Sequence, residues 1–123
     1  MMKILHFEDN AEKYMDIASV LRTVGETQTT WVESVEEGTV LLEREPFDLI
    51  ITDMHFPVTA YGQPELQAGD MVIRYVAEHK LQIPVITISS MRMQIPGAYR
   101  SIWYSDMADW EGELRACIKK IRA

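Results

Sequence analysis

The stretch that decides the fold is PFDLIITDMHFP, which runs from Pro46 to Pro57. Its apolar run, Leu49 to Ile51, does not alternate with polar residues, which is typical of a strand buried on both faces of a parallel sheet. The run ends just before Asp53, and Pro57 excludes a longer central strand because proline lacks the amide that the ladder needs. The pattern therefore predicts a central strand with an aspartate at its carboxyl end, where ligands bind in open α/β sheets.

The composition limits the class of protein. A length of 123 residues with 47% hydrophobic composition predicts a single globular domain, residues 1–123. The net charge of −7 argues against nonspecific binding to nucleic acid or to a membrane surface, because both need a basic face. No membrane span or signal peptide is indicated, so a cytoplasmic location is expected. Cys117 is the only cysteine, and it falls on the apolar stripe of a helix, which indicates a core residue.

Strand and helix patterns alternate along the chain. Apolar strands are predicted over residues 3–7, 27–32, 49–52, 83–88 and 99–104, and amphipathic helices over residues 11–24, 34–44, 70–80 and 110–121. Such alternation predicts a parallel sheet with helices on both faces. The aperiodic segment 55–69 is interpreted as a long loop, and segment 91–98 is too short for a substantial helix.

Two local patterns make finer predictions. Ser34 and Glu37 have the spacing of a capping box, in which each side chain satisfies a backbone donor of the other residue. His6 lies in a buried strand and is interpreted as a hydrogen-bonded core histidine.

Acidic side chains follow two strands that we expect to be neighbours. Glu8 and Asp9 come directly after the first strand, and Asp53 follows the third. Three carboxylates within a few ångströms repel one another unless a cation joins them, and oxygen ligands in a shallow site favour Mg²⁺. Ser89 ends the fourth strand and would bring a hydroxyl to the same pocket, although capping a turn is an equally good reading. A site of this kind suits attack by the Asp53 carboxylate on a phosphoryl group.

The segments KILHFEDN, FDLIITDMHFP and PVITISS, in this order, resemble the receiver domain of two-component response regulators, the CheY-like superfamily. The resemblance covers nearly the whole chain. It implies a flavodoxin-like, doubly wound sheet of five parallel strands in the order 2-1-3-4-5. In this chain the fourth helix is expected to be shortened or absent.

The resemblance also implies roles for individual residues. Asp53 would be the phosphoacceptor, and Ser89 the switch hydroxyl that bonds a phosphoryl oxygen. Magnesium would be held by Glu8, Asp9, Asp53 and the backbone carbonyl of His55, and the backbone amides of Met54 and Ser90 would contact the phosphoryl group. The phosphate would come from a histidine kinase or a phosphotransfer protein, and the output would run through contacts with another protein or a second copy. No enzymatic activity is expected beyond self-catalysed phosphoryl transfer and slow autodephosphorylation.

The chain also departs from the family pattern. Receivers carry a phosphoryl-binding lysine at the end of the fifth strand, where this chain has Tyr104, and the switch aromatic would fall near Ser101. These departures motivate an alternative, a pseudo-receiver that binds a protein without phosphorylation, with Tyr104, Arg92 or the long loop filling the pocket. A third hypothesis is a magnesium-dependent phosphohydrolase, but that chemistry needs an acid where this chain has His55.

Overall fold

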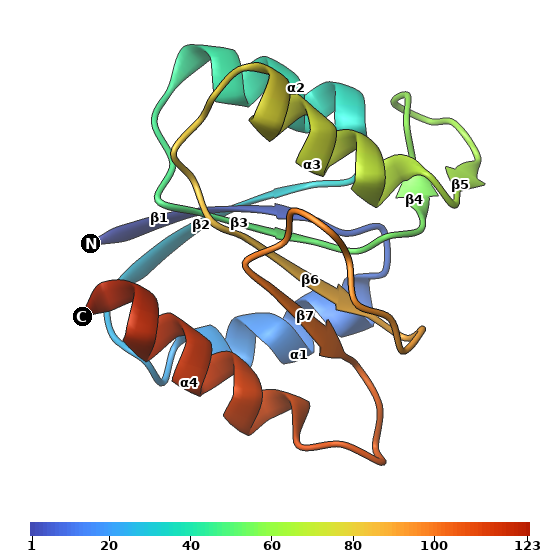
Figure 1. Cartoon of the computed structure of the whole chain (residues 1–123). Coiled ribbons are helices and arrows are strands. Elements are labelled where there is room, and N and C mark those ends of the chain that lie inside the picture. Colours follow the sequence, from blue (N-terminus) through green and yellow to red (C-terminus); the bar gives the residue numbers. More distant parts are fainter.

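The computed structural model describes residues 1–123 and shows a parallel sheet between two layers of helices (Figure 1). The sheet consists of β1 (Met2–Phe7), β2 (Thr27–Val32), β3 (Leu49–Thr52), β6 (Val85–Ser89) and β7 (Arg100–Trp103). Their order is β2-β1-β3-β6-β7, and every pair is parallel. Counted along the chain, this is the predicted order 2-1-3-4-5, so the predicted flavodoxin-like fold is confirmed.

Two helices cover each face of the sheet. On one face lie α1 (Ala11–Leu21) and α4 (Trp110–Arg122), and on the other lie α2 (Val35–Arg44) and α3 (Ala68–Glu78). Residues 90–99, between β6 and β7, contain no helix, as expected from the sequence. None of the four helices is long and apolar enough to cross a membrane.

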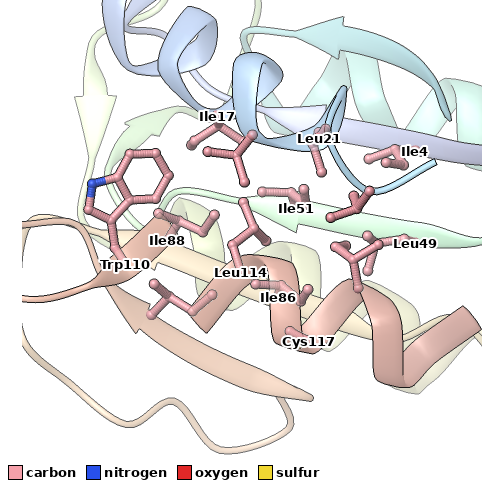
Figure 2. Close-up of a cluster of buried hydrophobic side chains, with 14 of the residues drawn as sticks. Ile4, Ile17, Leu21, Leu49, Ile51, Ile86, Ile88, Trp110, Leu114 and Cys117 are labelled. Carbon is pink, nitrogen blue, oxygen red and sulfur yellow. The ribbon is translucent and has the colours of Figure 1, made fainter. Parts of the chain in front are cut away.

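The core has two parts, one on each side of the sheet. In β3, Leu49 and Ile51 face α1 and α4, whereas Ile50 faces α2 and α3, and all three are fully buried. This alternation explains why the apolar run of the central strand is unbroken. Figure 2 shows the first part, where Trp110 and Leu114 of α4 pack with Ile17 of α1 against the strands. Cys117 lies in this cluster, as its position on the stripe predicts.

The segment after β3 is more ordered than the prediction of a loop. It contains an antiparallel pair, β4 (Phe56–Pro57) with β5 (Pro64–Glu65), and α3 begins two residues before Asp70. The pair forms because Phe56 is fully buried among the side chains under α2 and α3, and because Glu36 donates its backbone N–H to Val58. The segment is therefore anchored at its start and returns on itself.

The capping box at the start of α2 forms, but the Glu37 carboxylate has a different hydrogen-bond donor from the one predicted. Ser34 Oγ accepts the backbone N–H of Glu37 at 3.1 Å, as predicted. The Glu37 carboxylate accepts the Ser34 hydroxyl at 2.9 Å, and not a backbone donor. Ser34 thereby accepts and donates at once, which fixes the first turn of the helix.

The prediction of a hydrogen-bonded His6 is wrong. The ring is 1% exposed, and neither ring nitrogen has a hydrogen-bond partner. It lies on the α1 face of β1, where its neighbour is the Tyr14 ring at a centroid distance of 5.1 Å. Burial, helped by the nearby Lys13 charge, lowers the pKa of His6 from 6.5 to about 3, so the ring is neutral at pH 7.

We expect His6→Phe to stabilise the protein, since it removes a buried, unpaired N–H and leaves an aromatic ring in place. The expected gain at pH 7 is about 1–2 kcal/mol in the free energy of unfolding. The gain should grow as the pH falls. Between pH 6.5 and about 3 the unfolded wild-type chain binds a proton at His6 that the folded chain excludes, so wild type loses stability there.

Urea unfolding in a chelating buffer at pH 7 and pH 5 measures both effects. The difference between His6→Phe and wild type should widen by about 1.4 kcal/mol per pH unit below 6.5. His79→Phe is the matched control, because His79 is exposed and its ring has a partner in the Tyr75 carbonyl. A difference that is independent of pH would contradict the assignment of a neutral, buried imidazole.

Candidate functional site

Three carboxylates meet at the carboxyl ends of β1 and β3. Oxygen atoms of Glu8, Asp9 and Asp53 all lie within 4.8 Å of one another. The two strands are direct neighbours, and the backbone N–H of Asp53 donates to the Phe7 carbonyl at 3.0 Å, which aligns the strand ends. The structure therefore brings together the three acids that the sequence suggested.

Burial makes this cluster electrostatically costly. Burial raises the pKa of Glu8 from 4.5 to about 7; Lys13 opposes this rise and the Asp53 charge adds to it. Burial also raises the pKa of Asp9, and the Asp53 charge contributes in the same direction. In the absence of a bound cation, the cluster resists full ionisation near neutral pH.

The residues present fit a hard divalent cation. Glu8 is fully buried, its Oε1 atom has no hydrogen-bond partner, and one of its carboxylate oxygens lies within 4.8 Å of oxygens of Asp9 and Asp53. A buried carboxylate oxygen without a hydrogen bond is expensive, and a metal cation at this point would coordinate it. The donors are all oxygen atoms, which selects Mg²⁺ or a similar ion over softer metals.

A lysine that the sequence reasoning missed lies in the same cluster. Lys13 of α1 is only 7% exposed. Its Nζ donates a hydrogen bond to the backbone carbonyl of Ile88, at the end of β6, at 2.7 Å. The same Nζ forms ion pairs with Glu8 Oε1 at 3.2 Å and with Asp53 Oδ1 at 3.3 Å, and the contact with Glu8 lacks hydrogen-bond geometry.

The position of Lys13 in α1 explains how it reaches the strand ends. It is the third residue of the helix, after the N-cap Asn10, whose side chain accepts the Lys13 N–H at 3.0 Å. Side chains of a helix lean toward its N-terminus, and this terminus lies beside the end of β1. A cation at the N-terminus of a helix is repelled by the positive end of the helix dipole. The two carboxylates and the Ile88 carbonyl offset this repulsion and hold the ammonium in place.

The backbone after Asp53 is held by a close approach to α3. Met54 donates its N–H to Asp53 Oδ1 at 2.7 Å, and Gly69 donates its N–H to the Met54 carbonyl at 3.2 Å. A Cβ on Gly69 would lie 2.5 Å from Met54 Sδ and 2.7 Å from both Asp53 O and Met54 Cα. Glycine at position 69 is therefore required for the turn that presents Asp53.

Two predicted site residues lie at the end of β6, where Ser89 is its last residue and Ser90 follows it. Ser89 is buried, lines the pocket and accepts the Met91 N–H at 3.1 Å, so it does cap a turn. That bond uses a lone pair, and the hydroxyl proton remains available to a ligand. Ser90 also lines the pocket, whereas Met54 is buried beneath it and reaches the site by its backbone.

The remaining rim residues differ in their exposure and contacts. His55 is exposed and lines the pocket. The Tyr104 ring lies beneath Lys13, with Nζ 5.4 Å from its centroid, and its hydroxyl donates to Asp16 at 2.6 Å. Arg92 is not in the pocket, since its guanidinium stacks over Trp103 at 5.2 Å from the ring centroid. Neither Arg92 nor the loop fills the site, which is a cavity of about 460 Å³.

This arrangement of strands, helices and strand-end acids defines a class: the chain has the fold of response-regulator receiver domains, at 12–21% sequence identity to the solved structures compared. It is similar to the response regulatory domain of protein mrkE from Klebsiella pneumoniae (TM-score 0.78, 13% identity, 98% of this chain and 95% of that one). It is also similar to the receiver domain of a sensor histidine kinase from Pseudomonas aeruginosa, which has magnesium coordinated in its active site cleft (TM-score 0.75, 21% identity, 99% and 98% coverage).

A third similar structure is the response regulator protein TrrA from Thermotoga maritima in complex with Mg²⁺ and beryllofluoride (TM-score 0.76, 21% identity, 98% and 99% coverage). No protein-family model matches the sequence, and no curated protein matches it. At these identities the structural likeness establishes the fold.

Proposed function

We propose that residues 1–123 act as one receiver unit that accepts a phosphoryl group on Asp53 and signals through protein contacts. The observation that carries the proposal is the open pocket in which Asp53, at the end of β3, faces Glu8 and Asp9. TrrA has been seen in complex with a histidine kinase, which supports a phosphorylated histidine of a kinase or phosphotransfer protein as the donor.

The chemistry follows from the groups at the strand ends. An Asp53 carboxylate oxygen attacks the phosphorus of a phosphoimidazole, the P–N bond breaks, and its electron pair returns to the ring nitrogen. Asp53 thereby becomes an acyl phosphate. As the resemblance implies, we assign the donors to the phosphoryl oxygens to the Ser89 hydroxyl and the backbone N–H groups of Met54 and Ser90.

Glu8, Asp9, Asp53 and the His55 backbone carbonyl would hold the magnesium ion. When bound, this ion neutralises charge on the phosphoryl group. The protein residues would supply the rest: Glu8 and Asp9 would hold the ion, and the turn after β3 orients Asp53.

A second candidate function has one specific observation in its favour. The Lys13 ammonium already lies between Glu8 and Asp53, as a built-in counter-ion would in a module that works without metal or phosphate. This is the pseudo-receiver alternative. It predicts that neither Mg²⁺ nor a phosphoryl analogue binds the pocket.

Beryllofluoride binding distinguishes the two candidates. We expect it to bind wild type only when Mg²⁺ is present, to raise the melting temperature and to change tryptophan fluorescence. Trp31 and Trp103 report on the site, because their indole N–H groups donate to the carbonyls of Glu8 and Ser90. Glu8→Gln should lose the response, whereas Glu111→Gln, an exposed position on α4, should keep it. No response in wild type would favour the pseudo-receiver.

A further inference from the structure

We propose that Lys13, at the start of α1, is the residue that binds the incoming phosphoryl group, in place of a lysine at the end of the last strand. This inference rests on the proposed function, because it assigns a phosphoryl-binding residue within the same pocket.

The pocket needs a positive side chain, and only one amine or guanidinium lines it. Its lining includes four carboxylate residues, and Lys13 is the sole lysine or arginine among the residues around it. A phosphoryl group would bring further negative charge next to Asp53 and two other acids. Without a fixed cation beside Asp53, repulsion would oppose its entry.

Lys13 is held where a phosphoryl group on Asp53 would come within its reach. Its Nζ is 3.3 Å from Asp53 Oδ1, the same oxygen that accepts the Met54 N–H. The single strong hydrogen bond of the ammonium goes to the Ile88 carbonyl, one residue before Ser89. The remaining two N–H groups point toward the carboxylates of Glu8 and Asp53, with which Nζ forms ion pairs. They can also donate to the oxygens of a phosphoryl group on Asp53.

The residue at the end of the last strand completes the arrangement. Tyr104 follows β7, and its backbone N–H donates to the Ser89 carbonyl at 2.8 Å. The aromatic face supports the Lys13 ammonium at 5.4 Å from the ring centroid. The hydroxyl is anchored on Asp16, one turn after Lys13 in α1. Tyr104 is thus a positioning residue, and a lysine at this point would bring its ammonium group close to the space that Lys13 uses.

The test separates phosphoryl binding from metal binding. In Lys13→Met, incorporation of phosphate from acetyl phosphate at saturating Mg²⁺ should fall by about 100-fold. Affinity for Mg²⁺ alone should rise by about threefold or more, because an ammonium no longer competes for Glu8 and Asp53. Lys119→Met, on the exposed face of α4, is the matched control and should match wild type in both measurements.

Relocating the lysine tests position directly. The double variant Lys13→Met/Tyr104→Lys should recover incorporation to within about tenfold of wild type, since the new ammonium occupies the same space. Lys13→Gln serves if Lys13→Met does not fold. Incorporation by Lys13→Met within about threefold of wild type would overturn the inference and leave the proposed function standing. Joint loss of Mg²⁺ binding and incorporation without recovery would mean that Lys13 is only structural. Failure of wild type to incorporate phosphate would overturn both.

Discussion

Asp53→Asn is expected to abolish phosphoryl acceptance, with incorporation from acetyl phosphate in the presence of Mg²⁺ falling by about 100-fold or more. The amide is nearly the same size as the carboxylate but is a poor nucleophile, and it removes one charged oxygen ligand from the metal cluster. The fold should persist, because the substitution relieves repulsion among three acids whose oxygens lie within 4.8 Å. Hydroxylamine-labile phosphate on the protein and its intact mass are the measurements.

Asp48→Asn is the matched control for this experiment. Asp48 lies just before the opposite end of the same strand, is exposed and accepts the backbone N–H of Lys3 at 2.8 Å, a bond that an asparagine oxygen can also accept. It should therefore incorporate phosphate like wild type. Equal incorporation by wild type and Asp53→Asn would remove Asp53 from the mechanism and, with it, the receiver function.

Gly69→Ala should damage stability and phosphoryl acceptance together. The added Cβ would lie 2.7 Å from Asp53 O and Met54 Cα, and these are backbone atoms that cannot move without displacing the turn that carries Asp53. Overpacking of this kind costs about 1–3 kcal/mol in the free energy of unfolding. The displaced turn should also weaken the bond from the Met54 N–H to Asp53 Oδ1 and slow incorporation. Urea unfolding and the acetyl phosphate assay measure the two effects.

A double variant shows which contact is responsible. Met54→Ala removes the Sδ atom that lies 2.5 Å from the added Cβ, but it leaves the two backbone contacts. Added to Gly69→Ala, it should therefore recover little of the lost incorporation. Full recovery would mean that only the Met54 side chain obstructs alanine, and that the backbone approach is looser than the structure indicates.

The fold and the acidic cluster were predictable for a simple reason. The run from Leu49 to Ile51 is apolar at every position because it contributes to both core layers, and such runs identify central strands. Parallel strands share one carboxyl edge, so acids that follow neighbouring strands must converge there. Strand order alone is therefore enough to predict that Glu8, Asp9 and Asp53 lie close together.

Lys13 was missed although the sequence contains its signal. The predicted stripe of the first helix ran through Tyr14, which is only partly buried. The buried positions are Lys13, Ile17, Val20 and Leu21, at the same spacing as the buried residues of α4. A lysine within an apolar stripe is seldom buried without a charged partner, and the nearest unexplained acids were those of the cluster. Periodicity alone could not say which of the two adjacent residues faces the sheet.

The errors at His6 and in the segment after Asp53 have tertiary causes. Position in a strand fixes the burial of His6, but whether a hydrogen-bond partner is present depends on the neighbouring helix, which offers the Tyr14 ring and no acceptor. The β4–β5 pair depends on the packing of Phe56 under α2 and α3. The glycines and prolines of the segment predict a loop and give no indication of this packing.

Because no helix lies between β6 and β7, the connection from the site to the edge strand of the sheet is short. Only ten residues join the two strands, where a helical crossover normally takes a dozen or more. The Trp103 indole, on the outermost strand, donates to the carbonyl of Ser90 at 3.0 Å. Any displacement of the Ser90 main chain must stretch or break that bond, so a partner protein sensing this domain would find the earliest change at the border strand and its tryptophan.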